Sequence, residues 1–443
     1  MSEHSQLSRP LAVPTGRLSR MARMGSLAAG VAGRMAVDGV RQWGQGSRPT
    51  TRDLFLTPSN IQRVADELAR MRGAAMKIGQ LVSMDTGDVL PPELAEIMAR
   101  LRADADFMPP KQLRDVLDAE WGTGWRHQFA QFDVRPIAAA SIGQVHRARL
   151  PDGTDLAIKV QYPGIARSID SDVANVGRLI RMSGLLPEGF ELGPYLDEAR
   201  AQLKEEADYM AEAAHLQRFG HLLERDPRFK LPNLYAPLTT QKVLAMSFVP
   251  SDGIESVANL AQETRDQVMY DLCALMLREL FDFGTMQTDP NFANYRFDPA
   301  SGRVVLLDFG ATRAVPQDLA DQMRALIRAG MAGARSDVAR IVAVMGLVPD
   351  TVMDPFRTRI LDMIMIVFDE IRAAPFLDLG TSDLSRRLQR EGEALAADGF
   401  VPPPVPMDLL YVQRKVAGMF LLASRLRARV PVADLIAGGM DTE

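Results

Sequence analysis

The chain is 443 residues long, with 47% hydrophobic and 24% charged residues, a balance that excludes a disordered protein and predicts two or three folded lobes. Its net charge of −5 and its single cysteine, Cys273, exclude a strongly basic nucleic-acid-binding protein and a disulfide framework. No apolar run approaches about 18 residues, so no transmembrane helix is expected.

Charge is unevenly distributed, because the first 50 residues are basic. This segment holds seven arginines against Glu3 and Asp38, so it carries +5 and leaves −10 for the remainder. Two interpretations stay open. Residues 1–50 are either a flexible, solvated tail or a basic amphipathic segment that lies on an anionic membrane surface.

Helical patterns dominate the next part of the chain. Thr57-Pro58 provides an N-cap with proline at the first helical position. From Ile61 to Val82 apolar residues recur every three or four positions, which predicts one face of a long helix. Pro91-Pro92 ends that region, and a second helix is expected at Lys111–Glu120.

Strand patterns begin at Ile137. The runs Val145–Leu150 and Leu156–Gln161 flank Pro151-Asp152-Gly153-Thr154, a turn with glycine where a positive φ is favoured. Further strands are expected at Lys242–Phe248, Asn294–Phe297 and Val304–Leu307. Helices are expected at about 168–184, 195–219 and 263–283, and throughout the chain after Pro316 except at Pro402-Pro403-Pro404. This order predicts an α+β protein with a small β-rich lobe and a large helical lobe.

Lys159 is the first residue that indicates chemistry, because it lies in the otherwise apolar strand Leu156–Gln161. An edge-strand lysine that faces solvent is one interpretation. A buried ammonium would instead need an anion, and the strand lysine of protein kinases contacts the phosphates of ATP and pairs with a helix glutamate.

A second set of residues has the spacing of a kinase catalytic loop. Asp289 precedes Asn294 by five residues, and Asp308-Phe309-Gly310 follows a hydrophobic strand. In kinases the first Asp orients or deprotonates the attacking group, while the Asn and the later Asp hold Mg²⁺. The ordered set therefore predicts Asp289 as the catalytic group and Asn294 and Asp308 as metal ligands.

Three departures separate the chain from ordinary protein kinases. Ala138-Ala139-Ala140-Ser141 stands where a glycine-rich phosphate loop belongs, and Gln287-Thr288 replaces the usual His-Arg. The chain also lacks an A-P-E motif, so no substrate-docking activation segment is expected.

Together these motifs resemble the UbiB/AarF family, atypical protein-kinase-like proteins tied to ubiquinone (coenzyme Q) biosynthesis. The resemblance runs from about Val13 to the C-terminal helices. It rests on Lys77-Ile78-Gly79-Gln80 (K-x-G-Q), Ala138-Ala139-Ala140-Ser141, Glu206-Ala207-Asp208 (E-x-D), Gln287-Thr288-Asp289-Pro290-Asn291 and Leu307-Asp308-Phe309-Gly310.

The resemblance implies a bilobal protein-kinase-like fold with a helical K-x-G-Q extension over the nucleotide cleft. The expected domains are the basic segment 1–50, for which both interpretations above stay open, the K-x-G-Q extension at 51–128, a kinase-like N-lobe at 129–249 and a helical C-lobe at 250–443.

The resemblance also assigns roles to individual residues. Phosphates would be bound by Lys159 together with Ala138, Ala139, Ala140 and Ser141, and Glu212 would pair with Lys159. Adenine would contact the hinge residues Met246, Ser247, Phe248 and Val249. The helix that carries Lys77, Gly79 and Gln80 would fold over the nucleotide cleft and block the docking of a protein substrate. Lys77 would meet the acidic pair Glu206 and Asp208.

The resulting expectation is an ATPase that hydrolyses Mg·ATP to support ubiquinone biosynthesis at a membrane surface, with ATP and Mg²⁺ as cofactors and without phosphorylating proteins in trans. A non-catalytic nucleotide- and lipid-binding scaffold is the main alternative, and a small-molecule kinase is a third. The expected partners are ATP or ADP, an anionic membrane surface or a ubiquinone-like lipid, other ubiquinone-biosynthesis proteins and a second copy in a homodimer, with no nucleic acid. The expected location is the cytoplasmic face of a bacterial inner membrane, with the matrix side of the mitochondrial inner membrane as the alternative.

Overall fold

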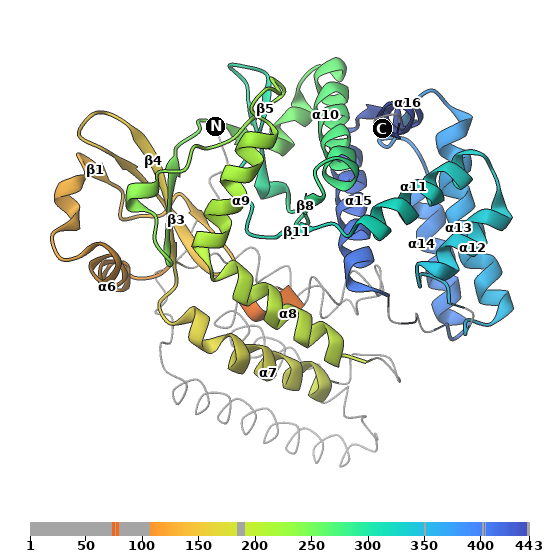
Figure 1. Ribbon diagram of the computed structural model, residues 1–443, viewed down its shortest axis with the longest axis horizontal. Coiled ribbons are helices and arrows are strands. Elements are labelled where there is room, and N and C mark those ends of the chain that lie inside the picture. The colour runs from red at the N-terminus through yellow and green to blue at the C-terminus, as the bar shows by residue number, and fades with distance from the viewer. Residues whose placement is uncertain are drawn as a thin grey trace, which may run out of the picture. The chain divides into compact units, whose positions relative to one another are not determined.

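The computed structural model describes residues 73–75, 77–78, 107–183, 191–349, 351–400, 403 and 405–440. The chain divides into two compact units, one of Met1–Ala214 with Asn233–Phe248 and one of His215–Pro232 with Val249–Glu443 (Figure 1). Segment 1–50 and most of the expected long helix lie outside the described residues. The four-segment domain division stays a prediction.

The first unit contains a five-stranded antiparallel sheet. Its strands run in the order β1-β3-β4-β6, and β2 also pairs with β3. The bounds are β1 Gln131–Phe132, β2 Ala138–Ala139, β3 Gly143–Arg149, β4 Asp155–Gln161 and β6 Val243–Ser247. The strands expected from the apolar runs are confirmed, as is the β3–β4 turn, where Gly153 has a φ of 90°.

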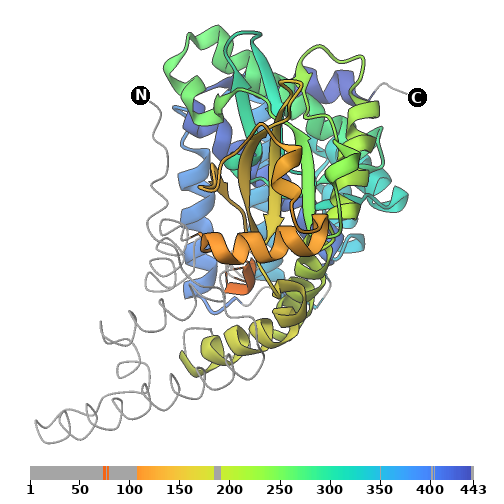
Figure 2. The same cartoon turned by 90° about the vertical axis from the view of Figure 1, so that its left-hand side faces the viewer.

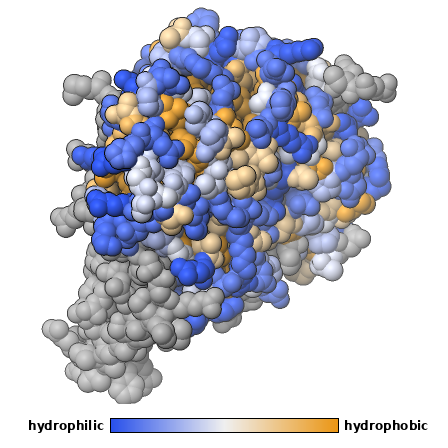
Figure 3. Space-filling model, turned by 60° about the vertical axis from the view of Figure 1, so that its left-hand side comes forward, coloured by the Kyte–Doolittle hydropathy of each residue, from blue (hydrophilic) through white to orange (hydrophobic). Residues whose placement is uncertain are grey.

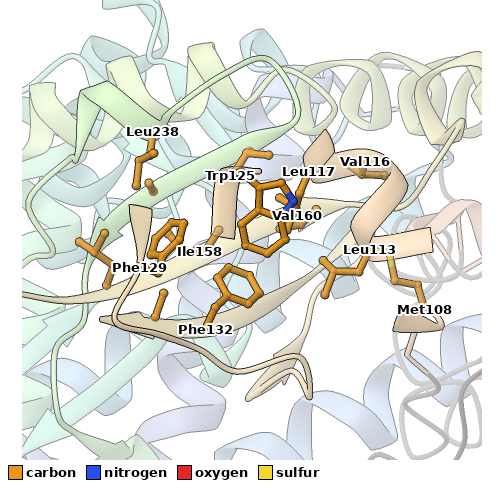
Figure 4. Close-up of a cluster of buried hydrophobic side chains, with 14 of the residues drawn as sticks. Met108, Leu113, Val116, Leu117, Trp125, Phe129, Phe132, Ile158, Val160 and Leu238 are labelled. Atoms are coloured by element: carbon orange, nitrogen blue, oxygen red, sulfur yellow. The ribbon is translucent and has the colours of Figure 1, made fainter. Parts of the chain in front are cut away.

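One face of this sheet is covered by α6 (Pro110–Trp121), which lies across the strands in Figure 2. The short helix η2 (Trp125–Gln128) completes the cover. Aromatic and aliphatic side chains from α6, η2, β1 and β4 form one buried cluster, in which Trp125 packs 4.9 Å from Phe132 (Figure 4). This core holds the strand that carries Lys159 in a fixed place.

Three helices follow β4, where two were expected. They are α7 (Ile165–Ser183), α8 (Gly193–Glu206) and α9 (Tyr209–Leu222). The expected single helix at 195–219 is wrong, because Asp208 interrupts it. Its Oδ1 accepts hydrogen bonds from the backbone N–H groups of Met210 and Ala211, so it caps a new helix.

The second unit has two small sheets near the expected catalytic motifs. The first has the order β5-β10-β9-β7 and contains β5 Phe229–Lys230, β7 Asp252–Gly253, β9 Tyr295–Asp298 and β10 Arg303–Leu306. In the second, β8 (Thr285–Gln287) pairs with β11 (Thr312–Ala314). The two strands expected around residues 294–307 are confirmed as the β9–β10 hairpin.

Helices form the rest of the second unit. They are α10 Gln262–Phe281, α11 Gln317–Met331, α12 Arg335–Val344, α13 Asp354–Ala373, α14 Leu384–Ala397, α15 Met407–Leu426 and α16 Val432–Met440. Helices α11, α12, α13 and α15 share a hydrophobic core. Within the described residues, the all-helical expectation after Pro316 is wrong at two short segments, β12 (Leu377–Asp378) and β13 (Arg429–Val430), which pair with each other.

Hydrophobic side chains are interspersed with hydrophilic ones on the face drawn in Figure 3, as is ordinary for a protein surface. Among the described residues, none of the helices combines the length and the apolar character needed to span a bilayer.

Candidate phosphoryl-transfer site

Lys159 forms a buried ion pair with Glu212 of α9. Its Nζ lies 2.7 Å from Oε1 and 2.9 Å from Oε2, and the two side chains are 9% and 3% exposed. The solvent-facing alternative for Lys159 is wrong, because β4 lies between β3 and β6 and is not an edge strand. Glu212 lies in the first turn of α9, where the helix dipole favours a negative charge. Glu212 thus holds the Lys159 ammonium in a fixed position, as the helix glutamate does for the strand lysine of protein kinases.

The alanine-rich segment forms a tight connection into β3. Ala138 and Ala139 make up β2, the Ala140 N–H donates to the Gly143 carbonyl over 2.8 Å, and Ser141 Oγ donates to Glu206 Oε2 over 2.6 Å. Gly143 was not expected to matter. A Cβ there would lie 2.5 Å from the Val160 carbonyl oxygen, so only glycine permits this approach to β4.

The described part of the K-x-G-Q motif contacts one of the two expected acidic residues. Lys77 is 5% exposed and forms an ion pair with Glu206, the same carboxylate that accepts the Ser141 hydroxyl. Asp208 instead uses its carboxylate to cap α9. Gly79 and Gln80 lie outside the described residues.

The expected hinge follows the end of β6. The N–H groups of Ser247 and Phe248 donate to the carbonyls of Asn233 and Asp155, over 2.8 and 2.9 Å. Met246 is buried, and Val249 is the first residue of the second unit's later segment. Contacts of these residues with adenine stay a prediction.

In the second unit, the loop after β8 brings Asp289 and Asn294 together. The Asn294 amide nitrogen donates to both the carbonyl oxygen and Oδ2 of Asp289, each over 3.2 Å. Thr288 anchors the start of the loop, because its N–H and its hydroxyl donate to the Ala311 carbonyl over 2.9 and 2.8 Å. The Asn294 side chain therefore has its amide nitrogen turned toward Asp289.

Asp308 lies beside this loop. The N–H of Leu307 donates to the carbonyl of Asn294 over 3.1 Å, and Asp308 Oδ1 accepts the N–H of Gly310 over 2.9 Å. Phe309 is buried 4.9 Å from the Phe219 ring. These contacts bring the three residues expected to carry chemistry to one end of the β9–β10 hairpin.

The oxygen donors of Asp308 and Asn294 fit Mg²⁺, a hard cation that prefers carboxylate, carbonyl and water oxygens. Across the described ranges there is no cluster of three or more His, Cys, Asp or Glu side chains that could hold a metal. A magnesium ion here would therefore complete its shell with phosphate and water oxygens, as it commonly does in phosphoryl-transfer sites.

Two residues of α15 that contact this loop were missed by the sequence analysis. Arg414 Nη2 donates to Asp289 Oδ1 over 2.7 Å, and Lys415 Nζ donates to the Gln287 carbonyl over 2.8 Å. The available signal was a pair of adjacent cations inside the apolar stretch Leu409–Met419. Their partners lie 125 and 128 residues earlier in the chain, where no local pattern identifies them.

Comparison with known proteins places these motifs in a family. A model described as the ABC1 atypical kinase-like domain matches residues 100–344. The atypical kinase COQ8B of Rattus norvegicus, described as mitochondrial, is 38% identical over 97% of this chain and 82% of its own length. The mitochondrial atypical kinase COQ8 of Saccharomyces cerevisiae is 36% identical over 96% of this chain and 84% of its own length.

A solved structure agrees with the fold. The Rv3197 protein of Mycobacterium tuberculosis, solved with erythromycin, superposes with a TM-score of 0.60 at 25% identity over 85% of this chain and 95% of that chain. The expected α+β, protein-kinase-like fold is confirmed. The chain therefore belongs to the ABC1 atypical kinase-like family, the UbiB/AarF group of atypical kinases of ubiquinone biosynthesis that its motifs indicated.

Proposed function

We propose that this protein binds Mg·ATP and hydrolyses it in support of ubiquinone biosynthesis. The observation that carries the proposal is the set of contacts joining Asp289, Asn294 and Asp308 within one unit. The buried Lys159–Glu212 pair supports it independently. In kinases both the strand lysine with its glutamate and the metal-binding Asp must be in place for transfer.

The residues of the chain divide the work of hydrolysis. Lys159 and the Ala138–Ser141 segment would hold phosphate oxygens. Asn294 and Asp308 would hold Mg²⁺, which would supply positive charge to offset the charge of the phosphates. The Asp289 carboxylate accepts a hydrogen bond from a water molecule and aims it at the γ-phosphorus. The new P–O bond forms as the bond to the bridging oxygen breaks, ADP leaves with that electron pair, and both protons of the water stay on the released phosphate, which leaves as H₂PO₄⁻. Positioning and charge supply most of the rate in such reactions.

The segment after Asp308-Phe309-Gly310 favours water over a protein as the acceptor. Strand β11 begins at Thr312 and pairs directly with β8, and α11 begins at Gln317. The connection between the metal-binding motif and α11 is thus a few residues long. Protein kinases use a longer segment here, ending in A-P-E, to dock their substrates.

The membrane setting and the partners extend the proposal. The basic segment 1–50 would bind anionic lipid at the cytoplasmic face of a bacterial inner membrane, with a ubiquinone-like lipid, other ubiquinone-biosynthesis proteins or a second copy as partners. A mitochondrial matrix location, as the names of the relatives indicate for them, is the alternative.

The test measures nucleotide binding and phosphate release by the purified chain, with and without vesicles containing anionic lipid. Asp308→Asn and Lys159→Met should each lower release by at least about 100-fold, while Asp318→Asn, at an exposed position of α11, should match the wild type. Release that rises with vesicles supports the membrane setting. Nucleotide binding with equally slow release in wild type and Asp308→Asn would refute the ATPase and favour the scaffold.

A further inference from the structure

Helix α15 presents one face to the loop that carries Asp289. Arg414 and Lys415 are adjacent, and Gly418 follows them by four and three residues, so it lies on the same side of the helix as each of them. Each touches a different point of the loop, and α15 passes beside β8 and β11 (Figure 1).

Arg414 controls the orientation of the Asp289 carboxylate. The Arg414 side chain is 8% exposed and donates to Oδ1, while the Asn294 amide donates to Oδ2. Each oxygen of the Asp289 carboxylate thus accepts a hydrogen bond from a different residue. Together the two hydrogen bonds determine the plane of the carboxylate. Each carboxylate oxygen offers about two lone-pair sites, so both can still accept a hydrogen bond from an attacking water. A charge-assisted bond of this kind is stronger than a neutral one.

Lys415 joins the two ends of the same loop. Its ammonium donates to the Gln287 carbonyl over 2.8 Å and to the Tyr295 hydroxyl over 3.0 Å, and it lies 3.1 Å from Glu279 Oε2. An ammonium has three donors, and a further hydrogen bond to Gln287 Oε1 over 3.4 Å completes the set, while the Glu279 carboxylate compensates the charge. Gln287 ends β8 and Tyr295 begins β9, so one buried side chain ties the entry of the loop to its exit.

Gly418 lets the helix approach the middle of the loop. A Cβ at this position would lie 2.1 Å from the Cβ of Pro290, closer than two carbon atoms can be without displacement. The proline therefore packs directly on the helix backbone. With Arg414 and Lys415, this makes three fixed points along residues 287–295.

We propose that Arg414 and Lys415 are positioning residues for phosphoryl transfer, and that α15 is a working part of the site because it sets the geometry of the Asp289 loop. This inference rests on the proposed function of Asp289 and deepens it. Neither side chain needs to touch nucleotide. Arg414 acts through the Asp289 carboxylate, and Lys415 acts through the backbone that carries it.

The first test is kinetic. Arg414→Gln should lower kcat for phosphate release by about 10- to 100-fold, because displacing a catalytic group by about 1 Å costs up to that much. KM for ATP should change by less than about threefold, because binding of ATP in the ground state is unaffected. Arg414→Lys should recover part of the rate. In an Asp289→Asn background, Arg414→Gln should cause no further loss, because its effect passes through that carboxylate. The control is Arg425→Gln on the same helix, whose side chain is 67% exposed.

An independent loss in the Asp289→Asn background would overturn the positioning role of Arg414, as would an unchanged kcat in Arg414→Gln.

The second test does not depend on turnover. Amide hydrogen exchange of residues 287–295 should speed up in Arg414→Gln and in Lys415→Met, and not in Arg425→Gln. If Arg414→Gln does not fold, Arg414→Lys is measured in its place. Lysine keeps a positive charge at the buried position, but its ammonium lacks the planar set of donors of the guanidinium. Unchanged exchange of the loop in the folded variants overturns the inference. If the wild type itself releases no phosphate, the proposed function fails, while the exchange result still decides whether α15 positions the loop.

Discussion

Replacing Lys415 by methionine should destabilise the second unit strongly. Lys415 is 2% exposed and Glu279 is 1% exposed, so the change leaves a buried carboxylate without its cation. Breaking a buried ion pair by removing one partner costs about 3–5 kcal/mol. For a domain of this size, each kcal/mol lowers Tm by about 2–4 °C, so a loss of roughly 6–20 °C is expected.

The pH dependence of the loss provides a sharper test. Burial raises the pKa of Glu279 above its ordinary value of 4.5, and Lys415 partly offsets this. Without Lys415 that pKa rises further, so the folded variant holds a proton that the unfolded chain releases. Its stability is therefore greatest below about pH 4.5 and falls as the pH rises through the pKa of the folded state, by about 1.4 kcal/mol for each unit of difference.

Thermal unfolding of the full chain at pH 5 and pH 8, followed by circular dichroism, measures both effects. The loss of Tm relative to wild type should be larger at pH 8. Lys415→Met with Glu279→Gln should regain part of the stability, because the buried charge is gone. Lys230→Met is the matched control. The Lys230 side chain is 40% exposed, and its partner Asp298 keeps hydrogen bonds from Ala300 and Ser301, so the loss should be at most about 1 kcal/mol. A loss below 1 kcal/mol, or an equal loss at both pH values, would refute the reasoning.

Three further predictions follow from the first unit. Gly143→Ala should lose about 1–3 kcal/mol of stability in thermal unfolding, because the new Cβ would meet the Val160 carbonyl. Gly220→Ala is the control and should lose none, because there is open space around Gly220. Equal stability of the two variants would contradict the close approach of Gly143 to β4. Asp208→Ala should lower the free energy of unfolding by about 1 kcal/mol, because the cap of α9 is lost. Asp208→Asn should keep most of the wild-type stability, because asparagine also caps helices. An Ala variant as stable as the wild type would mean that the cap is dispensable. The pKa of His146, lowered to about 4 by burial, should appear as a titration midpoint near pH 4 in NMR spectra. Because the unfolded chain binds a proton near its ordinary value of 6.5, stability should fall between pH 6.5 and pH 4 by about 3 kcal/mol; a midpoint near 6.5 would rule this out.

Local patterns and the family resemblance together predicted which residues lie near one another at the candidate site, and their catalytic roles stay predictions. The strand pattern around Lys159 left a solvent-facing lysine open, the kinase-like context indicated a buried one, and the family resemblance implied Glu212 as its partner, which the structure shows. Asp289, Asn294 and Asp308 were recognised by their spacing around a hairpin, which the β9–β10 pairing confirms.

The features that were missed depend on contacts between distant segments or on a competing local role. Arg414 and Lys415 have partners more than 100 residues away, so their contacts with the loop become visible only once α15 packs on it. Asp208 was interpreted only as a partner of Lys77, and its action as a helix cap went unrecognised although it splits the expected helix. Gly143 was overlooked because its importance comes from a backbone contact with the neighbouring strand.

The most direct test of the central claim follows the γ-phosphate of ATP in ¹⁸O-enriched water. With Mg·ATP and anionic vesicles, the wild-type chain should release phosphate that carries one solvent-derived oxygen, and Asp308→Asn should release almost none. Such a result identifies water as the acceptor and this site as the catalyst. Recovery of the γ-phosphate on lipid, protein or a small molecule, or release that Asp308→Asn leaves unchanged, would contradict the claim that this chain is an ATPase.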